Sequence, residues 1–194
     1  MTDYPELYVI RHGQTEWNVA GRHQGRMDSP LTDTGKAQAR AVAGLLPQSG
    51  IQAFTSPLGR TKATAALVFQ GSDQVAREDA RLSEVGFGDW EGLCWDDIAA
   101  RWPDRAAMAE QEPFLWHFQA PGGETLAEVS ARCQSFLNDL TGPAIVITHG
   151  ISGRVLRGLW LGQNEYGMTG LPGGQGVVFH LSQAHGHRVL TPAT

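Results

Sequence analysis

Four short apolar runs divide the chain, at residues 7–10, 51–54, 144–147 and 177–181. Each is flanked by polar or glycine-containing sequence, which is typical of buried strands. Between the runs, apolar residues recur every three or four positions, as they do along one face of a helix. Strands that alternate with helices predict an α/β fold with a largely parallel sheet.

Two helices are expected between the first and third apolar runs. Thr32 is a suitable N-cap for an alanine-rich helix over residues 33–46, and Pro47 would end it. After the second run, Ser56-Pro57 has the order of an N-cap and a first helical residue. The side chain of Arg60 would then lie in the first turn of the next helix, beside the end of a strand.

Two further helices are expected in the second half of the chain. Residues 125–140 carry apolar side chains at i, i+3, i+4 and i+7, which predicts one buried helical face. Cys133 falls on that face, so we interpret it as a core residue. Another helix should follow His149-Gly150 and include Arg154, Leu156 and Leu159.

The segment 86–120 differs from the rest because it contains four of the six tryptophans. One interpretation is a helical insertion with its own aromatic core. A second is a lid over the carboxyl edge of the sheet, with at least one aromatic side chain facing a substrate. Both can hold together.

Length and composition favour one domain over residues 1–194 with a sizeable core, since 41% of the residues are hydrophobic. The net charge of −5 argues against a general nucleic-acid surface, which would need a basic face. It does not exclude a small anionic substrate, because a few arginines set a local positive potential. There is no apolar run of about 18 residues, so no membrane span is expected.

The N-terminal residues Met1-Thr2-Asp3-Tyr4-Pro5 lack the basic start and apolar stretch of a signal peptide. We therefore expect a cytoplasmic protein whose two cysteines, Cys94 and Cys133, stay reduced. A homodimer is an assembly that such a chain could form.

The strongest chemical signal is a pair of histidines at matched places. The first apolar run ends in Arg11-His12-Gly13 and the third in Thr148-His149-Gly150. In open α/β sheets, ligands bind beyond the carboxyl ends of the strands. A glycine at each place lets the chain turn sharply or lets a ligand approach.

These motifs and their order resemble the histidine phosphatase superfamily, also called the phosphoglycerate mutase-like superfamily. The resemblance covers almost the whole chain and continues through four further blocks: Pro30-Leu31-Thr32 with Gly35, Ser56-Pro57-Leu58-Gly59-Arg60-Thr61, Leu82-Ser83-Glu84 with Phe87-Gly88-Asp89-Trp90-Glu91-Gly92, and Pro121-Gly122-Gly123-Glu124-Thr125. It implies a three-layer α/β/α sandwich with a helical lid, and a phosphate monoester as the small-molecule substrate. Within the superfamily, the chain looks like the bacterial branch of α-ribazole phosphatases and broad-specificity phosphatases.

Phosphoryl transfer needs a nucleophile, positive charge on the non-bridging oxygens and an acid for the leaving oxygen. Arg11 and Arg60 can supply cationic clamps, and the amides at the start of the helix that carries Arg60 can add donors. His149 would stay protonated or donate a proton. Spacing alone cannot choose between His12 and His149 as nucleophile, but the resemblance implies His12, through a phosphohistidine.

The resemblance also implies roles for residues that would otherwise be unremarkable. Glu84 matches the proton donor of the family, and its apolar neighbours would raise its pKa toward working pH. Asn18, with Thr15 and the pair Gln24-Gly25, matches positions that hydrogen-bond phosphate. Glu124 and Thr125 match a block at the rim of the pocket.

Neither a metal nor another cofactor is expected. The sequence has no His-Glu-x-x-His and no clustered Cys/His spacing, and members of the family need no metal. The one tight histidine pair, in His185-Gly186-His187, is interpreted as a solvated turn between two strands.

Two alternatives to a phosphatase remain: a mutase and a non-catalytic phospho-ligand binder. Phosphoglycerate mutases of the family carry a lysine after the glutamate block and an arginine pair for the substrate carboxylate. Here no lysine occurs between residues 63 and 194, and no two arginines are adjacent. A pure binder would need no acid such as Glu84.

Overall fold

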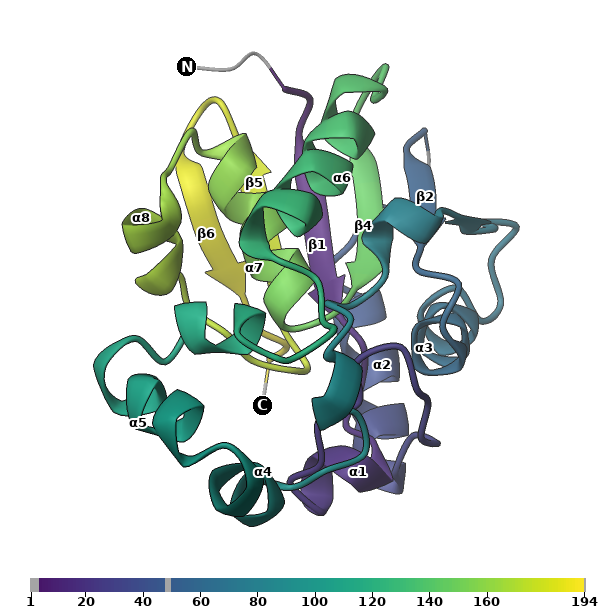
Figure 1. Ribbon diagram of the computed structural model, residues 1–194. Coiled ribbons are helices and arrows are strands. Elements are labelled where there is room, and N and C mark those ends of the chain that lie inside the picture. The colour runs from purple at the N-terminus through teal and green to yellow at the C-terminus, as the bar shows by residue number, and fades with distance from the viewer. Residues whose placement is uncertain (1–3, 48–49, 194) are drawn as a thin grey trace.

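The computed structural model describes residues 4–47 and 50–193, which form one six-stranded sheet with helices on both faces (Figure 1). Met1 to Asp3, which belong to the segment that lacks signal-peptide features, lie outside the described residues. The strands are β1 (Leu7–Arg11), β2 (Gln52–Thr55), β3 (Arg77–Glu78), β4 (Ala144–Thr148), β5 (Val178–Ser182) and β6 (Gly186–Leu190). The α-helices are α1 (Glu16–Val19), α2 (Asp33–Ala43), α3 (Gly59–Val68), α4 (Trp95–Arg101), α5 (Pro103–Gln111), α6 (Leu126–Asn138), α7 (Ile151–Trp160) and α8 (Glu165–Thr169). Three 3₁₀ turns are η1 (Ala80–Leu82), η2 (Gly88–Trp90) and η3 (Leu115–Phe118).

The strand order is β3-β2-β4-β1-β5-β6. The first four of these strands are parallel, whereas β5 is antiparallel to β1 and β6 is antiparallel to β5. The predicted α/β class with a largely parallel sheet and three layers is therefore confirmed. β3 was not expected, because it has only two residues, both exposed.

Successive side chains of β4 point to opposite faces of the sheet, and each face is covered by helices. All five of its residues are buried, as expected for a central parallel strand covered on both faces. Ala144 and Val146 join the hydrophobic cluster that includes residues of α6 and α7. Ile145 and Ile147 join the cluster formed with α2 and α3 on the opposite face. In the front of Figure 1, α6 and α7 cross the sheet, and α2 lies behind it.

Helix boundaries differ from the sequence predictions at two places. The helix expected over 33–46 ends at Ala43, and residues 44–45 form a turn before Pro47. The N-cap prediction for Ser56 is wrong: α3 begins at Gly59 with Leu58 as N-cap. By contrast, Thr32 caps α2 and Thr125 caps α6 through their side chains, as the sequence patterns indicate.

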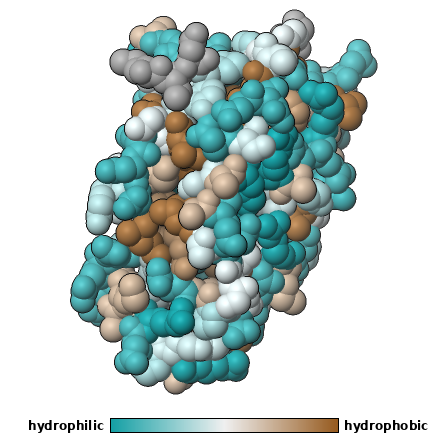
Figure 2. Space-filling model, turned by 45° about the horizontal axis from the view of Figure 1, so that its top comes forward, coloured by the Kyte–Doolittle hydropathy of each residue, from teal (hydrophilic) through white to brown (hydrophobic). Residues whose placement is uncertain are grey.

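The surface carries few large hydrophobic side chains. On the face that Figure 2 shows, hydrophilic residues predominate and hydrophobic residues form small groups. In the part of the chain that the structure describes, no helix is long and apolar enough to cross a membrane.

Candidate active site

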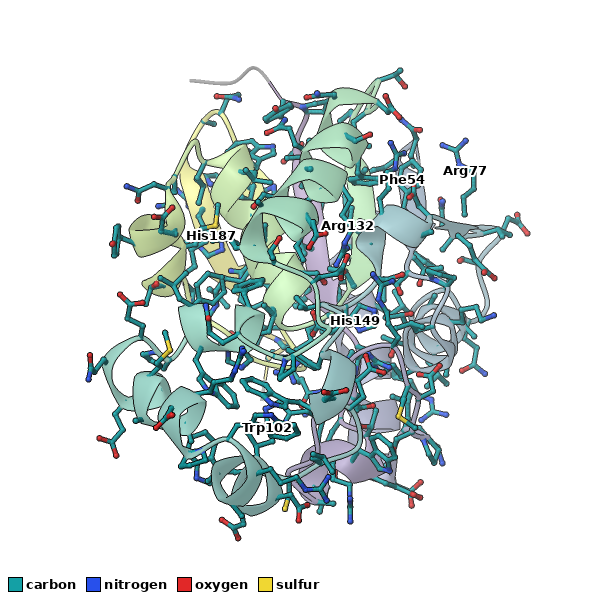
Figure 3. The ribbon with its side chains drawn as sticks, viewed as in Figure 1. Phe54, Arg77, Trp102, Arg132, His149 and His187 are labelled. Atoms are coloured by element: carbon teal, nitrogen blue, oxygen red, sulfur yellow. The ribbon has the colours of Figure 1, made fainter. Side chains whose placement is uncertain are left out.

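Strand pairing brings three side chains together at the carboxyl edge of the sheet. Arg11 pairs with Thr148 at the ends of β1 and β4, so the next residues, His12 and His149, lie side by side. Their ring centroids are 5.3 Å apart. β2 is paired with β4 on its other side, which places Ser56 against His149. Figure 3 shows His149 between the end of the sheet and the segment that carries Trp102.

One hydrogen bond defines the chemical form of His12. Its Nδ1 lies 2.8 Å from the carbonyl oxygen of Gly13, which can only accept, so Nδ1 must carry the proton. Nε2 then carries the free lone pair. Burial lowers the pKa of His12 well below 6.5, and the nearby cations Arg11 and Arg60 lower it further. The imidazole is therefore neutral near pH 7, as a nucleophile must be.

His149 is held through the opposite ring nitrogen. Its Nε2 is 2.8 Å from the hydroxyl oxygen of Ser56, whereas its buried Nδ1 has no hydrogen-bond partner among the described residues. Burial lowers the pKa of His149 well below 6.5, and Arg60, His12 and Arg11 add to the effect. The lowered pKa favours the neutral ring, whereas the expectation was a ring that stays protonated or donates a proton. A neutral ring with the proton on Nδ1 can still donate a hydrogen bond to a phosphoryl oxygen.

Arg60 is almost fully buried and rigidly held. Its Nη1 donates to the carbonyl oxygen of Met27 and to the Asp28 carboxylate at 3.0 Å, and its Nη2 donates to the carbonyl oxygen of Gly25. Its Nε has no partner among the described residues. The Nε of Arg11 is likewise buried without a partner. Both arginines line the cavity, and each has an Nε that no described residue engages.

The start of α3 does not offer its amides to a phosphate. The backbone N–H groups of Gly59 and Arg60 both donate to the carboxylate of Asp28. Asp28 therefore occupies the anion position at this helix N-terminus. The amide donors predicted here already bind Asp28, so the positive charge for a phosphate comes from the arginine side chains.

Glu84 lies in the cavity wall, but not in the apolar setting that was expected. Its Oε2 accepts hydrogen bonds from the backbone N–H groups of Gly150 and Ile151, and its Oε1 accepts from those of Ser152 and Val85. Three of these amides are at the N-terminus of α7. These hydrogen bonds fix the carboxyl group of Glu84 at the start of α7.

The residues expected to bind phosphate divide into two groups. Asn18, Gln24 and Gly25 line the cavity. Thr15 does not line the cavity: it is fully buried, and its side chain caps α1. Its Oγ1 accepts hydrogen bonds from the backbone N–H of Asn18 and from Nε2 of Gln24. Thr15 therefore holds Asn18 and Gln24 in position through hydrogen bonds and does not contact the cavity itself.

Glu124 and Thr125 also lie outside the cavity lining. Thr125 caps α6, and the Glu124 carboxylate accepts from the Gly86 amide and pairs with Arg132. Arg132 in turn donates to the carbonyl oxygens of Arg81, Ser83 and Glu84. Figure 3 shows Arg132 on α6, above His149. Together these bonds fasten the loop that carries Glu84.

The glycines after the two histidines allow close packing. A Cβ on Gly13 would lie 2.3 Å from the carbonyl oxygen of Gly35 in α2, and one on Gly150 would lie 3.3 Å from Arg11 Nε. Gly13 therefore lets α2 approach β1, rather than letting a ligand approach. Gly150 leaves room for the Arg11 guanidinium.

The cavity has a volume of about 430 Å³, which is suited to a small metabolite. The site residues form its floor, and the segment 86–120, hereafter the lid, forms one wall. The lid contributes Phe87, Pro113, Phe114 and His117 to the lining.

The four lid tryptophans do not line the cavity. Trp90 and Trp116 are stacked, with ring centroids 4.5 Å apart, and Trp102 packs against Trp90. Trp90 and Trp116 are buried and form an aromatic core of the lid, whereas Trp95 is 42% exposed. Other aromatic side chains of the lid, Phe87, Phe114 and His117, line the cavity.

The remaining candidate groups are structural. Both cysteines are free, and burial raises the pKa of Cys133 to about 12, consistent with an unreactive core thiol. The solvated-turn interpretation is wrong for His187, which lies in β6, stacks on Phe179 and contacts Arg157.

Within the described ranges, no group of three or more His, Cys, Asp or Glu side chains could hold a metal ion. Metal independence itself stays a prediction.

Sequence reasoning missed several residues of the site. Asp28 and Ser56 lie inside or beside recognised motifs, but nothing local shows that they contact Arg60 and His149. Gln175 belongs to none of the sequence motifs. Its Nε2 donates to the carbonyl oxygen of His12 at 3.0 Å and to Asn18 Oδ1 at 3.1 Å. No periodicity in its glycine-rich segment predicts this contact.

Known proteins with this fold and sequence pattern include phosphatases and mutases. The phosphoserine phosphatase 1 of Hydrogenobacter thermophilus is 32% identical over 158 residues, which cover 78% of this chain and 74% of that protein. The 2,3-bisphosphoglycerate-dependent phosphoglycerate mutase of Mesorhizobium japonicum is 34% identical, with 77% of this chain and 78% of that protein covered.

Two solved structures are similar over nearly the whole chain. The mycobacterial glucosyl-3-phosphoglycerate phosphatase in complex with VO₃ has a TM-score of 0.82 and 31% identity, and the match covers 98% of this chain and 100% of that one. A candidate α-ribazole-5′-phosphate phosphatase of Escherichia coli has a TM-score of 0.82 and 26% identity, with 97% of each chain covered.

The family model for the histidine phosphatase superfamily, branch 1, matches residues 7–192. This range contains the paired strands, both histidines and the lid. The chain belongs to the histidine phosphatase superfamily.

Proposed function

We propose that this protein is a metal-independent phosphomonoesterase that hydrolyses a small phosphorylated metabolite through a phosphohistidine on His12. The observation that carries the proposal is the form of His12: neutral, buried, with its Nε2 lone pair free. Beside it, Arg11 and Arg60 offer positive charge to a phosphate dianion. A ring of this kind can attack phosphorus without first losing a proton.

In the first step, Nε2 of His12 forms a bond to phosphorus while the bond to the ester oxygen breaks. Arg11, Arg60, His149 and Asn18 hold the non-bridging oxygens. The ester oxygen takes a proton from Glu84 and leaves as an alcohol. In the second step, Glu84 accepts a proton from water, whose oxygen attacks phosphorus and releases phosphate and neutral His12.

Glu84 acts as the acid in the first step and as the base in the second. Four backbone amides donate to its carboxyl group and hold it in one place for both steps.

A mutase is the second candidate, since a relative at 34% identity carries that name. Such an enzyme would pass the phosphoryl group from His12 back to a sugar or acid acceptor instead of to water. The names of the phosphatase relatives and the absence of a lysine after the glutamate block favour hydrolysis.

The test is hydrolysis of p-nitrophenyl phosphate and of a panel of phosphorylated metabolites, α-ribazole 5′-phosphate included, with EDTA present. Phosphate release equal to alcohol release is the expected result. Transfer to 3-phosphoglycerate without phosphate release would instead identify a mutase. Activity that EDTA removes and a divalent ion restores would overturn the metal-free mechanism, and binding without turnover would identify a phospho-ligand binder.

A further inference from the structure

We infer that the cavity contains a second anion subsite, formed by Arg154 and Arg157 of α7, for a carboxylate or phosphate at the far end of the substrate. The inference rests on the proposed function and deepens it, because it names the substrate class. The substrate would be a phosphate monoester with a second anionic group.

The first argument is charge without a counterion. Arg154 and Arg157 both line the cavity. Between residues 4–47 and 50–193, no carboxylate forms an ion pair with either guanidinium. Arg157 is only 2% exposed, and a buried unpaired cation is costly. Burial and the charge of Arg154 lower the pKa of Arg157 to about 9. An anion between these groups would relieve that cost.

The second argument is that the two arginines differ in how many of their hydrogen-bond donors are already used. The side chain of Arg157 is fixed: it donates to the carbonyl oxygens of Gly153 and Pro172 and contacts Nε2 of His187. The Nε of Arg154 is buried without a partner among the described residues. Arg154 therefore has donors to offer a ligand, while Arg157 supplies a fixed positive charge behind it.

The third argument is position. Arg154 follows Gly150 by four residues, or about 6 Å along the helix axis at roughly 1.5 Å per residue. The phosphoryl site lies at the start of α7, where Gly150 borders Arg11. Arg157 is a further turn along the same face, since residues three apart are neighbours on a helix. The helix positions of Arg154 and Arg157 therefore lie beyond the phosphoryl site along α7, and their side chains line the same cavity.

The cavity walls beside the two arginines are apolar. Phe114 of the lid lies 5.3 Å from Arg154 Cζ, measured to the ring centroid, and Phe179 lies 3.8 Å from Arg157 Cζ. Both rings line the cavity. Each guanidinium lies over one of the rings, within the range of a cation–π contact. The uncharged part of a substrate can pack against these rings while its second anionic group reaches Arg154.

The experiment compares substrates that differ only in the second anion. The pairs are 4-carboxyphenyl phosphate with phenyl phosphate, O-phosphoserine with O-phosphoethanolamine, and glucose 1,6-bisphosphate with glucose 6-phosphate. For at least one pair, kcat/KM should be roughly 10–100-fold higher for the member with the extra anion, as one charge-assisted hydrogen bond provides. The first two pairs report a carboxylate and the third a phosphate.

Arg154→Gln should reduce that preference to within a few-fold of unity, mainly through KM, and Arg154→Lys should keep part of it. The matched control is Arg40→Gln, which removes an exposed helical arginine on α2 and should leave the preference unchanged. Should Arg154→Gln not fold, the wild-type preference and the Lys variant still test the subsite.

The outcomes separate this inference from the proposed function. If all three pairs are hydrolysed with equal kcat/KM, or if Arg154→Gln keeps the full preference, the subsite is wrong and the phosphatase stands. If no substrate is hydrolysed, the proposed function is wrong. The same pairs then serve as ligands in titration calorimetry, where equal affinities within each pair would overturn the subsite as well.

Discussion

The two histidines of the site differ in which ring nitrogen is free. Gly13 holds Nδ1 of His12, and Ser56 holds Nε2 of His149. The free nitrogens are therefore Nε2 of His12 and Nδ1 of His149. With the proton on its Nδ1, His12 is suited to attack; with a proton on its own Nδ1, His149 is suited to donate. The partner of one nitrogen thus sets the role of the other.

His12→Ala should abolish turnover while the protein stays folded, because it removes the Nε2 nucleophile from a strand end. Labelled substrate should yield an acid-labile, base-stable phosphoenzyme on the wild type and none on the variant. His185→Ala, which alters a histidine outside the cavity lining, is the control and should still be labelled. Label that persists on His12→Ala would place the nucleophile elsewhere.

Glu84→Gln should slow hydrolysis of alkyl phosphates by roughly 10²–10⁴-fold, the usual range for a general acid. The loss should be much smaller for p-nitrophenyl phosphate, whose leaving group is stable as an anion. The good leaving group is an internal control for damage to the start of α7. Arg60→Ala, which removes charge stabilisation, should impair both substrates alike. Equal losses for Glu84→Gln would remove its role as acid and leave it as a helix cap.

At the scale of elements, carboxylates from loops cap two helices at the site. Asp28 accepts from the first amides of α3, and Glu84 accepts from the amides that begin α7. Each carboxylate also belongs to the loop that must be positioned against its helix. The helix N-termini, which carry partial positive charge, therefore fix the loops as well as the electrostatics of the cavity.

Arg132 of α6 also holds the loop that carries Glu84. Its guanidinium donates to three loop carbonyls at 2.7 to 3.2 Å and pairs with Glu124. Arg132→Gln should lower kcat more than it raises KM and lower the melting temperature, since a buried carbonyl without a donor costs about 1–3 kcal/mol.

Arg132→Lys should recover only part of the loss, because a point charge cannot make the forked bonds of a guanidinium. The leaving-group comparison described for Glu84 distinguishes positioning from stability alone. If kcat keeps its wild-type value for alkyl phosphates while the melting temperature falls, Arg132 supports the fold and does not position Glu84.

At the scale of the whole molecule, two hydrophobic clusters enclose a sheet whose polar edge carries buried imidazoles. His12 and His149 are each 2% exposed. The lid adds His117, whose pKa is lowered to about 4 by burial, and β6 adds His187, whose pKa is lowered to about 4 by burial and by Arg157. The folded protein therefore holds several histidines in neutral form below the pH at which they would protonate when unfolded.

Stability should consequently fall as the pH drops from 6.5 toward 4. In this window the unfolded chain binds protons at histidines with pKa near 6.5, while the folded chain does not, so the free energy of unfolding decreases. Each pKa unit of difference corresponds to about 1.4 kcal/mol before solvent screening. Thermal melting at pH 7, 6, 5 and 4 measures this loss of stability. His117→Phe should flatten the profile, and a profile flat in the wild type would contradict the neutral histidines.

Patterns of neighbouring residues were sufficient for the α/β class and for most of the candidate residues that line the cavity. The apolar runs predicted β1, β2, β4 and β5, because buried strands need near-continuous apolar residues. Glycine-flanked polar residues at strand ends indicated Arg11, His12 and His149, because parallel strands bring their carboxyl ends to one edge. The motif order pointed to Arg60, Glu84 and Asn18, which the structure places in one cavity.

Only the tertiary structure decided the partners of those residues. Asp28 with Arg60, Ser56 with His149, Glu84 with the start of α7, and Arg132 with the Glu84 loop are contacts between segments 32 to 93 residues apart. Such contacts leave no periodicity in the sequence, because they depend on how whole elements pack. For the same reason, two arginines on one helix read as ordinary helical residues until the fold placed them, without counterions, in the cavity that holds His12.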